Sequence, residues 1–184
     1  DITQRKQLEV RLKQANERLD HLAHHDELTE LFNRRAGLQR LDEEIKRCER
    51  YGTTFSIAIY DLDDFKAIND TYGHSTGDTV LQQTTALVSK ALRDTDLHIR
   101  LGGEEFLIIM PGVNAEEANL AMERVRETVA QTPFTEHLLT VTLSSGIACD
   151  VEASGTRLLE HADKAMYQAK QAGRNRIVIA SSSL

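Results

Sequence analysis

Apolar residues along most of the chain switch between the spacing of helices and the spacing of strands. The stripes and runs predict helices around 31–48, 80–92, 118–129 and 158–169, and strands over 55–61, 97–101, 106–110, 139–143 and 177–180. Asn33 is a suitable cap for the first of these helices, and Gly102-Gly103 predicts a tight hairpin. With one more helix at the N-terminus, the order α-α-β-α-β-β-α-β-α-β predicts an α+β fold, an α/β sandwich with a mixed sheet.

The N-terminal segment has a different pattern, with apolar residues spaced 4, 3, 4, 3. These seam residues are Leu8, Leu12, Ala15, Leu19 and Leu22. Such spacing is typical of a coiled coil, although only about two heptads are present. The alternative is an amphipathic helix that folds back on its own domain. We favour an intermolecular helix over residues 1–24, followed by a globular domain over 25–184.

Composition is ordinary for a soluble globular protein, with 40% hydrophobic and 28% charged residues. The net charge of −7 argues against non-specific binding to nucleic acid, whose phosphates select basic surfaces. No apolar run approaches the roughly 20 residues that span a bilayer. Cys48 and Cys149 both fall in apolar patterns and are expected to be core thiols. We expect a cytoplasmic location and, because the chain begins at Asp1 without Met, a piece of a longer protein.

Acidic residues cluster where two of the predicted strands end. Asp61 directly follows the run 55–60, whose apolar residues on both faces predict a central strand. Glu104 and Glu105 lie at the tip of the predicted hairpin. Carboxylates on neighbouring strands suit Mg²⁺, which prefers oxygen ligands and completes its shell with phosphate oxygens and water. Asp63-Asp64 is more typical of a solvated turn that ends the strand.

Several motifs together resemble the GGDEF family of bacterial diguanylate cyclases. Gly102-Gly103-Glu104-Glu105-Phe106 is similar to the family signature in its GGEEF form. Four further motifs occur in the family's order: 26–35 (DELTELFNRR), 61–66 (DLDDFK), 69–78 (NDTYGHSTGD) and 162–175 (ADKAMYQAKQAGRN). The resemblance implies a mixed, mainly antiparallel five-stranded sheet flanked by helices, like that of nucleotidyl cyclases and polymerase palms. The first residues, Asp1 to Lys6, also resemble the end of a PAS sensor domain.

The resemblance also implies roles for individual residues. Asp61, Glu104 and the carbonyl of Leu62 would bind Mg²⁺, or Mn²⁺ in its place. Glu105 would assist the metal or receive the proton of a 3′-hydroxyl. Asn69 and Asp78 would read guanine, whose adjacent N1–H and 2-amino group one carboxylate can accept together. The residues implied at the phosphates are Phe65, Lys66, Gly102, Gly103, Lys170 and Arg174. The alternative for Lys170 and Arg174 is a basic helix end that faces its own dipole.

The implied reaction joins two GTP molecules into cyclic di-GMP and releases two pyrophosphates. One domain carries one such site, so two must face each other in a homodimer, for which the N-terminal seam would raise the effective concentration.

A second constellation lies upstream of the hairpin. Arg93 and Asp96 resemble the family's RxxD inhibitory site for the product, with Arg124 as a further candidate. An arginine fork suits guanine O6 and N7. The alternative is a plain Arg–Asp pair that closes a helix.

Three residues depart from the family pattern, and one rival function remains. Glu30 stands where glycine is usual, Leu101 replaces a common aromatic residue, and Ser145 replaces an isoleucine. The rival is a catalytically silent GGDEF domain that serves as a receptor for GTP or cyclic di-GMP. Silent domains typically lose signature residues, which are intact here. A pure dimerisation module would leave the acidic tip unexplained.

Overall fold

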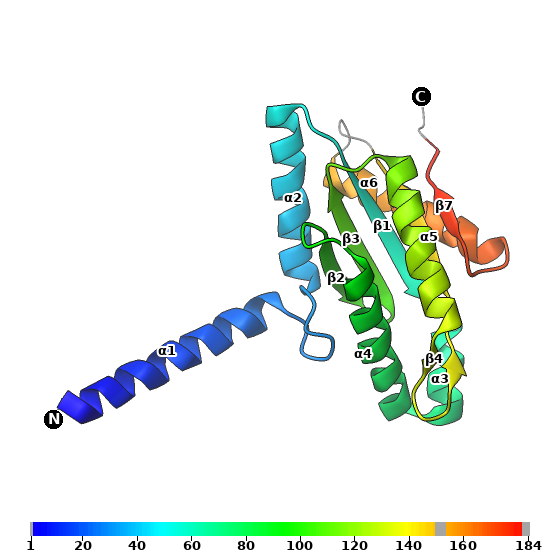
Figure 1. Cartoon of the computed structure of the whole chain (residues 1–184). Helices are drawn as coiled ribbons and strands as arrows, with labels where there is room; N and C mark the ends of the chain where they lie inside the picture. Colours follow the sequence, from blue (N-terminus) through cyan, green and yellow to red (C-terminus); the bar gives the residue numbers. More distant parts are fainter. Residues whose placement is uncertain (1, 150–153, 182–184) are drawn as a thin grey trace.

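The computed structural model describes residues 2–149 and 154–181 (Figure 1). Its elements are α1 (Ile2–His24), α2 (Arg34–Tyr51), β1 (Phe55–Leu62), α3 (Phe65–Tyr72), α4 (His74–Ala91), β2 (Leu97–Gly102), β3 (Glu105–Pro111), α5 (Ala115–Gln131), β4 (Pro133–Phe134), β5 (Leu139–Thr140), β6 (Leu143–Ala148), α6 (Gly155–Gln171) and β7 (Ile177–Ile179).

Five strands form the main sheet in the order β2-β3-β1-β6-β7, and β4 pairs only with β5. All neighbours in the main sheet are antiparallel except β6 and β7, which are parallel. The expected mixed, mainly antiparallel sheet is therefore confirmed. Strand β1 lies at its centre, and all eight of its residues are buried, as its apolar residues on both faces predicted.

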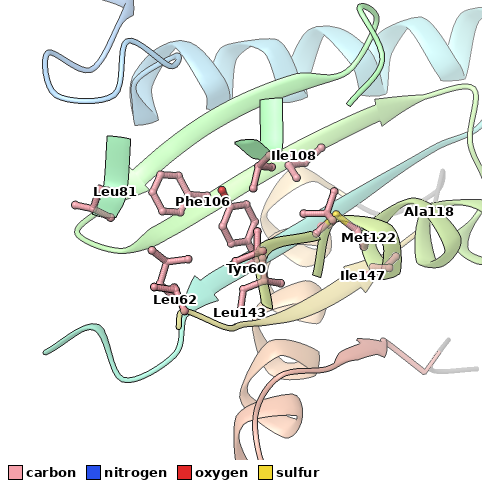
Figure 2. Close-up of a cluster of buried hydrophobic side chains, with 14 of the residues drawn as sticks. Tyr60, Leu62, Leu81, Phe106, Ile108, Ala118, Met122, Leu143 and Ile147 are labelled. Atoms are coloured by element: carbon pink, nitrogen blue, oxygen red, sulfur yellow. The ribbon is translucent and has the colours of Figure 1, made fainter. Parts of the chain in front are cut away.

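Helices cover both faces of this sheet, and the alternation of β1 divides its side chains between two cores. Ala58 and Tyr60 pack with residues of α4 and α5, while Ile57 and Ile59 pack with residues of α2 and α6. Figure 2 shows the first of these cores, in which the ring of Tyr60 stacks on Phe106. Because side chains alternate along a strand, Asp61 shares the α6 side with Ile57 and Ile59.

Polar side chains cap the helices that carry these cores. The side chain of Asn33 accepts a hydrogen bond from the Ala36 amide at 3.0 Å, so α2 begins where the cap was expected. Asn114 and Glu117 form a reciprocal capping box at the start of α5. Each cap satisfies amides that the first turn of a helix leaves unpaired.

Two expectations about elements were wrong. The strand expected over 139–143 is divided: Leu139–Thr140 pairs with β4, and the sheet strand is β6, which begins at Leu143. The first four residues of β6, Leu143 to Gly146, are all buried, but two of them are serines. A strand predicted from apolar residues alone therefore ends at Leu143, where β6 begins. Helix α3 was not expected, because its eight residues bury only Phe65 and show no repeated stripe.

Helix α1 extends away from the domain and buries none of its residues (Figure 1). Its seam residues Leu8, Leu12 and Leu19 have exposed fractions of 65%, 63% and 64%. The helix therefore does not fold back on its own domain, which contradicts that alternative; the domain division at 24/25 stays a prediction. Asp1, the first residue of the PAS-like stretch, lies outside the described residues.

The described residues bear on two further expectations. None of their helices is both long enough and apolar enough to cross a bilayer. Cys48 is buried and Cys149 is half-buried, and both thiols are free. The expectation of a core thiol is thus confirmed for Cys48, whereas Cys149 lies at the margin of the core.

Candidate active site

Asp61 lies near the end of β1 and is only 5% exposed. It is paired with Glu105 on β3, and its Oδ1 lies 2.8 Å from the Nζ atom of Lys170 on α6. Burial raises the pKa of Asp61 to about 6, Lys170 opposes this rise, and the charges of Glu104 and Glu105 add to it. The structure therefore brings together the three carboxylates and one of the cations that the sequence indicated.

The hairpin that carries Glu104 needs its two glycines. Gly102 has φ +150° and Gly103 has φ +54°, backbone conformations that residues other than glycine disfavour. The Arg100 guanidinium donates to the Gly103 carbonyl at 3.0 and 2.8 Å and to Asp26 Oδ1 at 2.9 Å. The hairpin tip is thus held against the segment that follows α1.

These groups fit a magnesium ion. The Leu62 amide donates to the Glu104 carbonyl at 3.3 Å, which brings Glu104 beside the end of β1. Burial raises the pKa of Asp61, the charges of Glu104 and Glu105 add to this rise, and a divalent cation would relieve the repulsion among the three carboxylates. Within the described ranges, no three side chains of the usual ligand types form a complete metal cage. Mg²⁺ typically takes one or two protein carboxylates and fills its shell with phosphate and water.

The two expected guanine readers lie close together across the α3–α4 junction. Asn69 belongs to α3 and Asp78 to the second turn of α4. The Oδ1 atom of Asn69 lies so near Gly77 that any side chain there would overlap it. Gly77, the residue before Asp78, therefore allows the Asn69 side chain to pack closely against α4. Asp78 is exposed, as a residue that meets a ligand must be.

The expected phosphate residues surround the end of β1. Phe65 is buried at the start of α3, and Lys66 beside it is exposed. Lys170 reaches Asp61 from the last turn of α6, so it does more than face its own helix dipole. Arg174 lies in the turn after α6, with its Nε atom 3.4 Å from Asp64 Oδ1. Lys170 and Arg174 thus reach the segment 61–66, which itself contains Lys66, from α6 and the turn after it.

Asp63 is a residue that sequence reasoning missed. It was expected to be part of a solvated turn, yet it is only 6% exposed. Its carboxylate accepts hydrogen bonds from Thr142 Oγ1 at 2.6 Å, Ser144 Oγ at 2.7 Å and the backbone amide of Asn175 at 3.0 Å. The signal in the sequence for buried partners of Asp63 was the pair of hydroxyl residues Thr142 and Ser144, which flank the first residue of β6.

The second constellation forms the turn between α4 and β2. The Arg93 amide donates to Asp96 Oδ2 at 2.9 Å, and the Asp96 amide donates to the Arg93 carbonyl at 3.0 Å. No ion pair joins their side chains in the structure as described, so a simple salt bridge does not account for the two residues. Asp96 Oδ1 is buried without a hydrogen-bond partner. Arg124 on α5 is exposed, and its side chain bonds to neither residue.

Comparison with known proteins shows the family to which the chain belongs. Residues 23–176 match the family model described as "Diguanylate cyclase, GGDEF domain". The chain is 41% identical over 160 residues to diguanylate cyclase DgcP of Pseudomonas aeruginosa, covering 84% of the chain and 24% of DgcP. It is 41% identical over 169 residues to the response regulator PleD of Caulobacter vibrioides, covering 87% of the chain and 37% of PleD. The chain thus spans about a quarter to a third of these relatives.

Solved structures give the same result. The coiled coil and GGDEF domain of DgcB from Caulobacter crescentus, in complex with c-di-GMP, superposes with a TM-score of 0.90 at 32% identity and covers 97% of both chains. The active GGEEF domain of a diguanylate cyclase from Vibrio cholerae has a TM-score of 0.78 at 32% identity, covering 82% of this chain and 98% of that one. The chain described here therefore belongs to the GGDEF family of diguanylate cyclases.

Proposed function

We propose that this domain is an active diguanylate cyclase that condenses two GTP molecules into cyclic di-GMP and two pyrophosphates. The observation that carries the proposal is the buried Asp61 carboxylate, which Glu104, Glu105 and Lys170 surround at the end of the central strand. Family membership and the names of the relatives support the same activity. The complete set of signature residues disfavours the alternative, a silent receptor for either nucleotide.

Asp61, Glu104 and the Leu62 carbonyl would hold Mg²⁺, or Mn²⁺ in its place. The bound cation would neutralise charge on the phosphates of GTP and polarise the α-phosphate toward attack. Lys66, Lys170 and Arg174 would offset the remaining negative charge, and Phe65 with the backbone of Gly102 and Gly103 would shape the phosphate pocket. Glu105, exposed on the same hairpin, would receive the proton of the attacking 3′-hydroxyl.

Recognition of the base would rest on Asn69 and Asp78. A carboxylate at Asp78 can accept hydrogen bonds from both N1–H and the 2-amino group of guanine. Adenine presents an acceptor at N1, so the same carboxylate would repel ATP. The tight packing of Asn69 on Gly77, the residue before Asp78, supports a shared contact with one base.

The reaction needs two domains, because each would hold one GTP. A homodimer formed through α1 would bring the two sites together. The exposed seam of α1 supports this assembly, as does the similarity over 97% of the chain to a structure described as a coiled coil and GGDEF domain.

Product would return to the turn between α4 and β2 and inhibit the enzyme. Arg93, which is exposed, would contact the guanine O6 and N7 atoms of cyclic di-GMP, and the carboxylate of Asp96 would accept from its N–H groups. Arg124 would assist from α5. Asp78 and Arg93 are fifteen residues apart along α4 and its end, about 20 Å at the rise of a helix, so this site would be distinct from the catalytic one.

The decisive experiment compares Glu104→Gln with the parent protein. Neutralising Glu104 removes a metal ligand with little change in volume, so the formation of cyclic di-GMP from GTP and Mg²⁺ should fall by about 100-fold or more. Glu49→Gln, an exposed change on α2, is the matched control and should retain full activity. Chromatography of the nucleotides measures the product. A parent protein that binds GTP but forms no cyclic di-GMP would support the receptor instead.

A further inference from the structure

The turn between α6 and β7 holds an unusual backbone conformation. Gly173, Arg174 and Asn175 have φ values of +114°, +63° and +45° in succession. Two of the three are not glycine, and side chains disfavour this region, so the surrounding structure must hold them there. The turn carries Arg174, one of the proposed phosphate cations.

Two tethers fix Asn175 in this turn. Its backbone amide donates to Asp63 Oδ2 at 3.0 Å, and its side-chain Oδ1 accepts from Arg126 Nη1 of α5 at 2.9 Å. The Asp63 tether reaches the backbone itself, at the peptide group that joins Arg174 to Asn175. A shift of Asp63 would therefore move the base of the Arg174 side chain.

Three hydrogen bonds hold the carboxylate of Asp63 in place. Oδ1 accepts from Ser144, while Oδ2 accepts from Thr142 and from the Asn175 amide. All three donors are neutral, and Asp63 forms no ion pair in the part of the chain that the structure describes. Asp63, in the turn that follows β1, thus differs from Asp61 on β1, which faces Lys170.

Three consecutive contacts join the end of β1 to the end of α6. Asp61 pairs with Lys170 at 2.8 Å, Asp63 binds the backbone of Asn175 at 3.0 Å, and Asp64 pairs with Arg174 at 3.4 Å. The outer two involve flexible cations that a phosphate can draw away. The Asp63 contact is buried and made to backbone, so we expect it to persist when a ligand binds.

We propose that Asp63 is a positioning residue that sets the place of Arg174 at the phosphate end of the site, and that it binds no metal. This inference rests on the proposed function for the identity of the phosphates, which belong to GTP. It assigns to the second aspartate of the 61–66 segment a role distinct from that of the first.

A double-mutant cycle tests the inference. Asp63→Asn replaces an acceptor with an amide that cannot accept from all three donors, and it should lower kcat/KM for GTP by about tenfold. Arg174→Ala removes the side chain that Asp63 is proposed to place. In the Arg174→Ala background, Asp63→Asn should lower kcat/KM by less than about twofold, because interacting residues are not additive. A similar loss in both backgrounds would mean a general structural effect and would overturn the proposal.

Hydrogen exchange supplies a readout that does not depend on activity. The Asn175 amide should be protected in the parent protein and should exchange at least about tenfold faster in Asp63→Asn. Thr142→Val is the matched control: it removes another donor to Asp63 but leaves the Asn175 contact, so protection there should persist. Equal protection of Asn175 in the parent protein and in Asp63→Asn would contradict this inference, whether or not the protein turns over GTP. A parent protein that turns over no GTP would instead refute the proposed function.

If Asp63→Asn does not fold, Arg126→Met provides the second variant. It removes the other tether of Asn175 from the side of α5, and the same cycle with Arg174→Ala applies. Loss of kcat/KM that disappears in the Arg174→Ala background supports positioning of Arg174 by the tethered turn. An additive loss would overturn it.

Discussion

Individual residues at the proposed site hold charge or backbone conformations that folding disfavours. Asp61 is a carboxylate removed from water and flanked by two glutamates, with one lysine as compensation. Arg174 and Asn175 adopt positive φ values. Groups with shifted pKa values and strained backbones gather at functional sites because function, not stability, retains them. The same residues should therefore be places where substitution stabilises the protein.

Asp61→Asn should stabilise the metal-free protein at pH 8 while it abolishes activity. The pKa of Asp61 is about 6 in the folded protein against a usual value of 3.8. The folded state thus binds the proton more tightly, and the stability that Asp61 contributes is lost as the pH rises from about 4 to 6. Asparagine carries no charge, so the variant should exceed the parent by about 1–3 kcal/mol at pH 8, at roughly 1.4 kcal/mol per pKa unit.

Denaturant unfolding in EDTA at pH 4 and pH 8 measures this difference. The gain from Asp61→Asn should shrink toward pH 4, whereas Asp163→Asn, an exposed change on α6, should show little dependence on pH. His98 is buried with its pKa lowered to about 3, and it affects all three proteins alike, so it cancels in the comparison. A gain that is the same at both pH values would contradict the raised pKa of Asp61.

Glu30 offers a second stabilising change, at the turn before α2. Its φ of +60° is a conformation that glycine adopts freely. The backbone of Glu30 bonds to Asp26 and His25, and glycine keeps these contacts. Glu30→Gly should raise the free energy of unfolding by up to about 1 kcal/mol, because relief of the left-handed strain exceeds the added entropy of the unfolded chain. Glu30→Ala retains the Cβ atom and should bring no such gain in the same measurement.

The sequence identified residues whose chemistry is local and missed those whose role depends on distant partners. Asp61 and Glu104 could be placed near each other because a strand end and a hairpin tip are visible in the pattern. The role of Asp63 depends on Thr142, Ser144 and Asn175, which lie 79 to 112 residues away in the chain. No local pattern distinguishes a solvated aspartate at a strand end from one that holds a remote turn.

Elements followed from periodicity wherever a stripe or an alternating run was long enough. Helices α2, α4, α5 and α6 each bury several residues on one face, so their stripes were visible. Helix α3 is too short to repeat a stripe. Strand β6 buries two serines: Ser144 Oγ donates to Asp63 Oδ1 at 2.7 Å, and Ser145 Oγ donates to the Ile59 carbonyl at 3.0 Å. Buried polar residues satisfied by tertiary hydrogen bonds are invisible to a search for apolar patterns.

The turn between α4 and β2 yields a prediction about feedback. Arg93→Ala should leave the initial rate of GTP turnover unchanged and raise the inhibition constant for cyclic di-GMP by about tenfold or more, the scale of one bidentate guanine contact. The backbone bonds between Arg93 and Asp96 do not need the guanidinium, so the turn should persist. Lys90→Ala removes a nearby charge from the last turn of α4 and serves as the control. Progress curves and calorimetry with product measure both effects.

An inhibition constant equal to that of the parent protein would remove Arg93 from product binding. If Arg93→Ala instead lowered the initial rate together with stability, the turn would be a structural helix end. Arg93 is exposed, and within the described residues no ion pair joins its side chain to Asp96, so the guanidinium is available to a ligand, which favours the regulatory outcome.

At the scale of the whole molecule, the domain presents one proposed half-site and one long unpartnered helix. The sheet order β2-β3-β1-β6-β7 puts the hairpin tip and the end of β1 side by side. The Arg100 contacts to Asp26 and to the Gly103 carbonyl connect that tip to the first residues after α1. In a dimer formed through α1, each hairpin would thus lie close to the helix that sets the orientation of the two domains.

The seam of α1 should therefore control activity through assembly. Leu12→Asp with Leu19→Asp puts charges at two exposed apolar seam positions, which a coiled coil would have to desolvate. The variant should be monomeric at concentrations where the parent is dimeric, and its specific activity should be lower and rise with protein concentration. Val10→Asp with Gln14→Asp adds the same charge to α1 away from the seam and should behave as the parent does. Analytical ultracentrifugation and assays over a range of dilutions measure both properties. If all three proteins have the same specific activity at every concentration, α1 does not assemble the active dimer.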